Sequence, residues 1–219
     1  MLLKSQAIVL QNVKHGDTSL IVKLFTREKG CVSYIVNGVR SPKAKFKASF
    51  FMPLSIIEII SQHKEVIQLQ RIQELRVEYM FVEIHADPLK NSLCLFIQEV
   101  LNKVLRFELQ TVELFDFVRY SLEVLDQIES GKKYFHLQFL LKLSAHLGYS
   151  FSEHAELVYG TDRKMVDALE ELKKEHYGLE NQISFSIKTM LDYLLRFYAK
   201  HIDNFLPLKS LDVLAEVHK

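Results

Sequence analysis

Seven cationic side chains within one 25-residue segment give this sequence its clearest chemical capability. They are accompanied by a single acid, Glu28, and by the aromatic residues Tyr34 and Phe46. Lysine and arginine neutralise phosphate groups, and an exposed aromatic ring stacks on a base without reading its identity. The segment is therefore predicted to bind nucleic acid, with Tyr34 as a stacking ring. The predicted phosphate contacts are Lys23, Arg27, Lys29, Arg40, Lys43, Lys45 and Lys47.

These assignments have simpler alternatives. A run of charges is usually only a solvated surface, but here nearly all the charges have one sign and lie on a predicted hairpin and its exit loop. Lys23 lies in the middle of a predicted strand, where its side chain can point off the binding face. Phe46 can stack on a base or, together with Phe50 and Phe51, fill the interior of the fold.

Short strands must position these side chains. Residues 20–25 and 32–36 alternate between two faces and are joined by a polar turn that ends at Gly30, which predicts a hairpin. Five strands are predicted in total, at residues 7–10, 20–25, 32–36, 54–60 and 66–72. Five short strands with one irregular insertion between the third and the fourth are typical of an OB-fold barrel, although an SH3-like barrel fits the pattern almost as well.

Beyond residue 76 the hydrophobic period changes from two to 3.6, which predicts helices. Asp87 and Pro88 read as an N-cap followed by proline at the first helical position. Helices are expected at residues 89–105, 115–125, 134–147, 165–172 and 187–202, with a last turn or two at 208–217. The predicted fold class is α+β, with a five-stranded OB-fold barrel at residues 1–78 and an all-α domain at 79–219.

The charge is distributed unevenly along the 219 residues, although the formal net charge is only +1. Residues 1–80 hold 12 basic and 6 acidic side chains, whereas the remainder holds 16 basic and 21 acidic ones. A basic front half indicates that a polyanion binds there. The two cysteines, Cys31 and Cys94, fit a reducing cytosol. No apolar run is long enough for a membrane span and no signal peptide is evident, so a cytoplasmic protein is expected.

Residue patterns typical of catalysis are missing from the sequence. It contains no phosphate-cradling glycine loop, no G-x-S-x-G motif and no H-E-x-x-H motif. Neighbouring carboxylates such as Glu170 and Glu171 point to different sides of a helix and are better read as a solvated face. We therefore expect a binding protein rather than an enzyme.

Several short segments resemble the RecO recombination-repair proteins in their order and spacing. In the front half these are residues 7–10 (AIVL), 16–22 (GDTSLIV), 24–30 (LFTREKG) and 38–41 (GVRS). Residues 140–148 are similar to the helix that precedes the zinc site of that family, and residues 206–211 (LPLKSL) are similar to its closing segment. Many members carry four zinc-binding cysteines, but residues 148–160 contain none, so neither a metal nor another cofactor is predicted. A smaller departure is Asp17, where the family more often has glutamate.

The resemblance implies a bacterial DNA repair protein that binds single- and double-stranded DNA and anneals complementary strands. It implies work with RecR, and sometimes RecF, to load RecA onto DNA coated by single-strand-binding protein, in the cytoplasm at the nucleoid. It also implies a pocket on the helical domain for the C-terminal tail of single-strand-binding protein, with Lys142 and Arg196 as candidate contacts. The residues alone leave two alternatives open, an OB-fold module that binds RNA or other oligonucleotides and a protein scaffold without affinity for nucleic acid.

Overall fold

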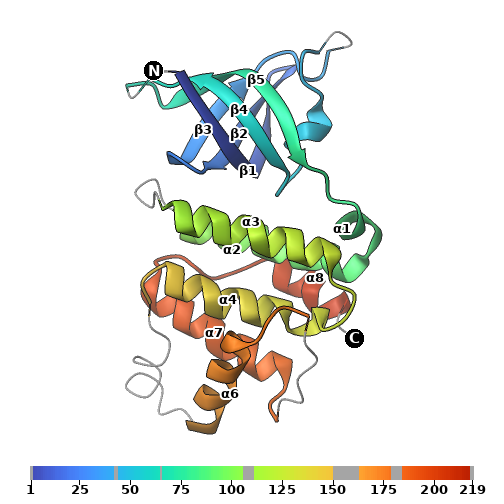
Figure 1. Cartoon of the computed structure of the whole chain (residues 1–219), viewed down its shortest axis with the longest axis vertical. Coiled ribbons are helices and arrows are strands. Elements are labelled where there is room, and N and C mark those ends of the chain that lie inside the picture. Colours follow the sequence, from blue (N-terminus) through green and yellow to red (C-terminus); the bar gives the residue numbers. More distant parts are fainter. Residues whose placement is uncertain are drawn as a thin grey trace. The chain divides into compact units, whose positions relative to one another are not determined.

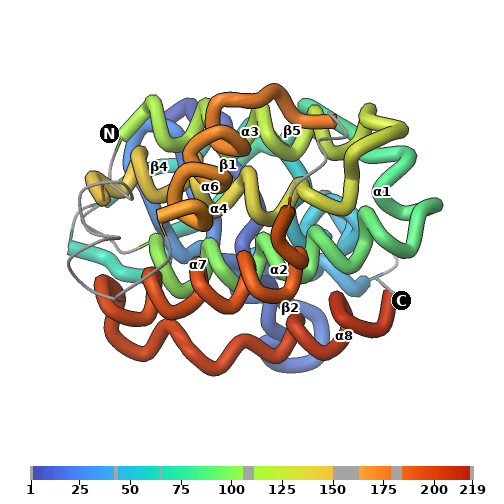
Figure 2. Tube along the Cα trace, turned by 90° about the horizontal axis from the view of Figure 1, so that it is seen from below, coloured from blue at the N-terminus to red at the C-terminus, as the bar shows by residue number. Residues whose placement is uncertain are grey.

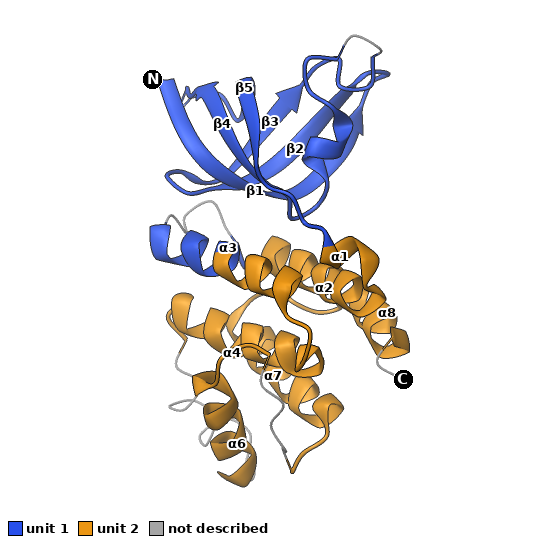
Figure 3. Cartoon of the chain, turned by 45° about the vertical axis from the view of Figure 1, so that its right-hand side comes forward, with its two compact units in different colours: residues 1–82, 104–119 blue, residues 83–103, 120–219 orange. Residues whose placement is uncertain are grey.

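A computed structural model describes residues 2–41, 44–64, 66–105, 111–149, 163–178 and 184–217. The chain divides into two compact units, one made of residues 1–82 and 104–119 and the other of residues 83–103 and 120–219 (Figure 3). The predicted division at residue 78 assigns residues 104–119 to the helical domain, whereas the structure groups them with the barrel. Within the described ranges, no helix has both the length and the apolar character needed to cross a membrane.

The first unit is built on a closed five-stranded barrel of the OB type (Figure 1). Its strands are β1 (Leu2–His15), β2 (Ser19–Thr26), β3 (Gly30–Val36), β4 (Ile56–Gln62) and β5 (Leu69–Tyr79), and they close in the order β1-β2-β3-β5-β4. Neighbouring strands are antiparallel except β3 and β5, which are parallel. The five predicted strands are thus all present. The fifth begins three residues later than predicted, at Leu69, because residues 66–68 belong to a loop.

Strict alternation along the hairpin decides which side chains fill the barrel. Leu20, Val22 and Leu24 of β2 belong to the buried core cluster, together with Val32 and other alternate residues of β3. A short 3-10 helix, η1 (Ala48–Phe51), adds Phe51, which is fully buried. Phe46 is 8% exposed and belongs to the same cluster, so of its two interpretations the structure supports the one in which it fills the interior.

The second unit is helical. Its elements are α1 (Glu83–Ala86), α2 (Pro88–Val104), α3 (Val112–Gln127), η2 (Lys132–Tyr134), α4 (Phe135–His146), α6 (Arg163–Lys174), α7 (Ile187–His201) and α8 (Ser210–Val217); the last residue of α2 and the first half of α3 belong to the barrel unit. α4 packs against both α6 and α7, and the trace in Figure 2 shows these three helices as neighbours. Because α4 is buried on nearly all sides, it is the central helix that its apolar sequence predicts.

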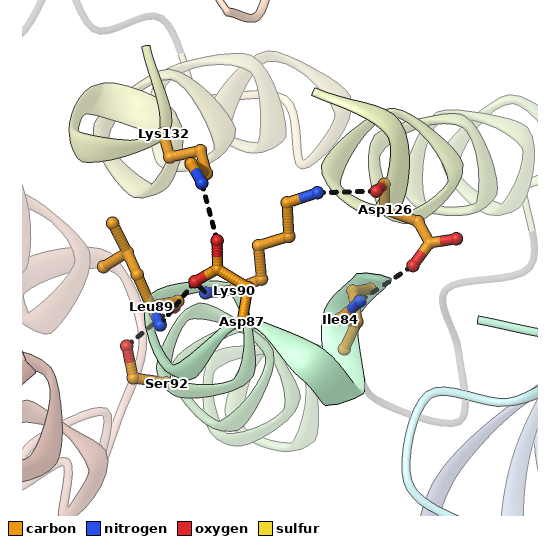
Figure 4. Close-up of polar contacts among 7 residues, drawn as sticks. All are labelled: Ile84, Asp87, Leu89, Lys90, Ser92, Asp126 and Lys132. Atoms are coloured by element: carbon orange, nitrogen blue, oxygen red, sulfur yellow. Dashed lines mark hydrogen bonds and ion pairs between the residues drawn. The ribbon is translucent and has the colours of Figure 1, made fainter. Parts of the chain in front are cut away.

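A buried polar cluster fixes the start of this helical unit (Figure 4). Asp87 caps α2, since its Oδ1 accepts hydrogen bonds from the backbone N–H groups of Leu89 (2.8 Å) and Lys90 (3.2 Å). Its Oδ2 accepts from Lys132 Nζ at 2.6 Å. Burial raises the pKa of the Asp87 carboxyl, but the hydrogen bonds from Lys132 and the two backbone groups outweigh burial and hold that pKa below its usual value. The predicted N-cap is therefore confirmed.

Lys90 completes this cluster from the third position of α2. Its side chain is buried, and Nζ donates to the carbonyl oxygen of Asp126 at 2.6 Å. The Asp126 carboxylate in turn accepts a hydrogen bond from the backbone N–H of Ile84 at 2.9 Å. These contacts join α1 and α2 to the end of α3 through charged groups that are removed from water.

Candidate nucleic-acid interface

The candidate nucleic-acid interface of the barrel unit is the outer surface of three adjacent strands, β2, β3 and β5. Cross-strand pairing aligns Lys23 of β2 with Ser33 of β3, and Ser33 with Leu69 of β5. The next row aligns Ile21 with Ile35 and Arg71. We call this surface the barrel face. Its outward side chains are Ile21, Lys23, Ser33, Ile35, Leu69 and Arg71.

Cations extend along the whole length of the barrel face. Lys29 lies in the β2–β3 turn at one end, and Lys23 lies at the centre. Arg40 marks the other end, because its backbone N–H donates to the carbonyl of Thr18, directly before β2, at 3.1 Å. A seven-residue strand such as β3 spans about 23 Å. The positive charge therefore follows a path long enough for several nucleotides, in keeping with the roughly 4–16 nucleotides that one OB fold covers.

Lys23 lies on the barrel face, half-buried, and not in the barrel interior. Two residues along the hairpin, towards the turn, Phe25 pairs with Cys31, and the Cys31 thiol is buried. Burial raises the pKa of Cys31 to about 11, and the positive charge of Lys23 opposes that rise.

Arg27 already has an anionic partner within its own unit. Its Nε and Nη2 each donate to one carboxylate oxygen of Asp116 in α3 at 2.8 Å. This two-point hydrogen bond raises the pKa of the Arg27 guanidinium and lowers the pKa of the Asp116 carboxyl. The rings of Phe25 and Phe115, with centroids 5.4 Å apart, pack beside the pair. A phosphate could therefore use the Nε and Nη2 donors that face Asp116 only by displacing that carboxylate.

Tyr34 does not lie where the stacking prediction requires it. It points into the barrel, is fully buried, and has its hydroxyl 3.5 Å from Ser61 Oγ. Burial raises the pKa of this hydroxyl. The prediction that Tyr34 stacks on a base is thus wrong, because strand alternation puts it on the same side as Val32 and Val36.

The segment after β3 supplies two exposed lysines. Lys45 Nζ donates to the backbone carbonyl of Gln73 in β5 at 2.6 Å and lies 5.3 Å from the centre of the Phe46 ring. Lys47 is exposed, like Arg40. Lys43 lies outside the residues that the structure describes.

Arg71 is a cation of the barrel face that the sequence did not single out. It is exposed, and the parallel pairing of β3 with β5 brings it beside Ile35. The alternation of apolar and polar residues in the sequence does not predict that Arg71 faces outward, because the residue buried next to it, Gln70, is itself polar. In addition, β5 begins at Leu69, later than the hydrophobic pattern suggests.

Lys142 and Arg196, the two partner contacts expected on the helical unit, differ in their surroundings. Lys142 Nζ donates to the carbonyls of Lys173 (2.6 Å) and Glu175 (3.0 Å) at the end of α6, so it is already engaged. Burial, followed by the nearby charge of Lys173, lowers the pKa of Lys142. Arg196 is exposed on α7. These carbonyls leave fewer donors of Lys142 for an acidic tail, and both Lys142 and Arg196 stay predictions.

A groove of the helical unit lies between α7 and α8. Its volume is about 460 Å³, and leucines form much of its wall. Lys188 lines it, but so do Asp192 and Asp212. The two acids make its charge unsuited to an anionic tail. Among the described residues, no three His, Cys, Asp or Glu side chains are placed to hold a metal ion, and most of the segment that corresponds to the family's zinc site, residues 150–162, lies outside them.

Comparison with known proteins matches two long segments of the chain to models of one family. The family model "Recombination protein O N terminal" matches residues 1–81, and "Recombination protein O C terminal" matches residues 85–164. Among similar curated proteins, "DNA repair protein RecO" of Flavobacterium psychrophilum is 32% identical, that of Phocaeicola vulgatus 31% and that of Christiangramia forsetii 30%. Each alignment covers 99% of this chain and 99% of the relative.

Proposed function

Because the chain belongs to the RecO family of DNA repair proteins, we propose that it binds single- and double-stranded DNA through the barrel face and anneals complementary strands. The observation that carries this proposal is the row of cations formed by Lys23 of β2, Lys29 of the β2–β3 turn and Arg71 of β5. For Lys23, Lys29 and Arg71, the described part of the chain supplies no side-chain hydrogen bond or ion pair. Their charge is available to phosphates.

Annealing needs no covalent step on such a surface. Two DNA strands repel each other through their phosphates, and cations that neutralise part of that charge allow closer approach and release bound counterions. Lys23, Lys29 and Arg71 contact backbone and not base edges in this proposal, so pairing is decided by the two DNA strands themselves. The protein then acts as a mediator and not as an enzyme.

The proposed partners follow the family. We propose that the protein works with RecR, and with RecF where RecF takes part, to load RecA onto DNA coated by single-strand-binding protein. The C-terminal tail of single-strand-binding protein is proposed to contact the helical unit, with Arg196 as a candidate. Arg40, Lys43, Lys45 and Lys47 are proposed as further phosphate contacts beyond the end of β3.

The test is annealing of two complementary fluorescent strands by the wild type and by Lys23→Gln/Lys29→Gln/Arg71→Gln. The variant is expected to anneal at least tenfold more slowly. Its plot of log affinity against log salt for single-stranded DNA should become shallower by about 2, since each lost phosphate contact removes about 0.7 from the slope.

The matched control is Lys133→Gln/Lys174→Gln/Lys209→Gln, which removes the same charge from exposed positions of the helical unit. It should anneal like the wild type. Unchanged annealing by a folded barrel-face variant would overturn the proposed site. Binding without annealing by the wild type would leave only an oligonucleotide-binding module.

A further inference from the structure

A cleft opens in the barrel wall where β3 and β5 separate. The two strands pair only between residues 33–35 and residues 69–71. Beside residues 30–32, no strand of the described chain pairs with the β5 side of β3. A cleft of about 750 Å³ lies at this gap. That volume falls in the range of roughly 300–1,000 Å³ typical of small-molecule pockets.

The lining of this cleft combines apolar walls with a cation. Ile21, Cys31 and Leu69 supply apolar surface, and Lys29 contributes its positive side chain. Lys23 lies one row further along the same face. A nucleotide complements this lining, because its base offers a flat ring to the apolar walls and its phosphate offers a negative charge to the lysines. A peptide with acidic side chains alone would satisfy the lysines but would leave the apolar walls without a partner.

An apolar loop tip stands next to the cleft. Val66, in the β4–β5 loop, is 96% exposed, and Ile67 is 45% exposed and lines the cleft. Two β-branched side chains held in water have no role in the barrel core. Apolar side chains in such positions insert beside or between bases in many nucleic-acid complexes.

Gln70 holds this loop in place from inside the barrel wall. It is 4% exposed, and its Nε2 donates to the carbonyl of Lys64 at 2.7 Å and to that of Ile67. Its Oε1 accepts from the backbone N–H of Lys64 at 3.1 Å. The loop also closes on itself, since Ile67 N–H donates to the Lys64 carbonyl at 3.1 Å. The exposed tip is therefore preorganised for contact with a ligand.

We propose that the cleft takes one unpaired nucleobase, with Val66 and Ile67 inserted beside it and adjacent phosphates on Lys23 and Lys29. This inference rests on the proposed function and deepens it, because it makes the β4–β5 loop the element that favours a single strand over a duplex. A base inside a duplex is covered by its neighbours and must first be unpaired and unstacked. The loop thus holds a strand with its bases exposed, ready to meet a complement.

The test compares Val66→Ser/Ile67→Ser with the wild type in binding a labelled oligonucleotide and a blunt duplex of the same length at one salt concentration. Loss of the apolar contacts that Val66 and Ile67 make with the base predicts a loss of about tenfold in single-strand affinity and little change for the duplex. The salt dependence should be unchanged, because no charge is removed. A 2-aminopurine in the single strand should change its fluorescence with the wild type and not with the variant.

The control variant is Met52→Ser/Met80→Ser, which removes two other exposed apolar side chains of the same unit. It should bind like the wild type. Equal losses for strand and duplex, or no loss in a folded Val66→Ser/Ile67→Ser protein, would overturn the inference while leaving the proposed function standing. A wild type that binds no DNA at all would overturn both.

Discussion

Lysines of the barrel face and the buried or half-buried lysines of the helical unit are used in opposite ways. In the helical unit, Lys90, Lys103 and Lys142 donate from Nζ to backbone carbonyls at 2.6, 2.8 and 2.6 Å. On the barrel face, Lys23 and Lys29 have no such partner among the described residues. A cation bound to a carbonyl satisfies a polar group that folding removes from water, whereas an unpartnered cation adds to the field outside the protein. The difference predicts that changes in one unit affect stability, and changes in the other affect binding.

The largest expected effect tests the close packing of the helical unit. Gly131 has φ +68°, and a Cβ at this position would lie 2.4 Å from the carbonyl carbon of Gly178. Gly131→Ala should therefore lower the free energy of unfolding by about 3–5 kcal/mol, as severe steric substitutions do. Gly148→Ala is the control, because its φ is +79° but nothing lies within 4 Å. It should cost only the backbone strain, about 1–2 kcal/mol. If thermal or urea unfolding gave equal losses of stability for Gly131→Ala and Gly148→Ala, the close packing of Gly131 on Gly178 would be contradicted.

The next effect tests whether the buried lysine serves stability. Lys90→Met keeps the length of the side chain but leaves the Asp126 carbonyl without its Nζ donor. A loss of about 1–3 kcal/mol is expected, the usual cost of an unsatisfied buried polar group. Lys133→Met, at an exposed position of the same unit, should change stability by less than about 0.5 kcal/mol. DNA affinity should be the same for both folded variants. Weaker DNA binding by a folded Lys90→Met variant would contradict the view that Lys90 serves stability alone.

A third effect depends on pH. Glu99 caps α8, since its carboxylate accepts from the N–H groups of Lys209 (3.0 Å) and Ser210 (2.8 Å) and from Ser210 Oγ (2.7 Å). Burial raises the pKa of Glu99, but these hydrogen bonds outweigh burial and lower that pKa below the ordinary 4.5. A lowered pKa stabilises the folded state above the unfolded pKa, and this stability is lost as the pH falls through the folded pKa.

Glu99→Gln should therefore cost about 1 kcal/mol at pH 7, as the loss of a helix cap does. The difference from the wild type in melting temperature should shrink as the pH is lowered from 5 toward about 3. Glu216→Gln, at an exposed position of α8, should leave the pH dependence unchanged. A constant difference at every pH would mean that the Glu99 charge is not what stabilises α8.

The smallest effect concerns the one cation of the hairpin turn that is already paired. Asp116→Asn removes the charge that holds Arg27 and should free Arg27 for a phosphate. DNA affinity is expected to rise about threefold to tenfold, with a salt dependence steeper by about 0.7 for a single strand. Glu113→Gln is the matched control, because Glu113 acts on Arg27 only through its more distant charge. Unchanged affinity in Asp116→Asn would mean that Arg27 does not reach DNA.

Local patterns were sufficient to predict much of the barrel. The hairpin of β2 and β3 could be predicted because alternation over a few residues and a turn that ends at Gly30 are local properties. The helix that starts at Asp87 and Pro88 could be predicted for the same reason, since capping involves groups only two or three residues apart. The cationic segment was also visible, because its charges are close together in the sequence.

The direction of a side chain could be predicted from the sequence only where one face of a strand is apolar and the other is polar. The sequence does not reveal that Tyr34 is buried, because tyrosine is common at both surfaces and interiors and only the closure of the barrel buries it. Arg71 was missed because its role depends on the parallel pairing of β3 with β5, which no local pattern encodes. Lys142 was taken for a free cation, although the end of α6 supplies carbonyls that bind it.

The sequence by itself thus determined the elements, the basic character of the hairpin and the family, because each depends on neighbouring residues or on their order. Only the tertiary structure decided which cations remain available. Arg27 and Asp116, which form an ion pair, are 89 positions apart in the sequence. Gln70 holds the β4–β5 loop by hydrogen bonds, and no sequence pattern predicts that the tip of this loop is exposed. Hydrogen bonds satisfy the charges that folding brings together, and the charges left without partners are those that can act on another molecule.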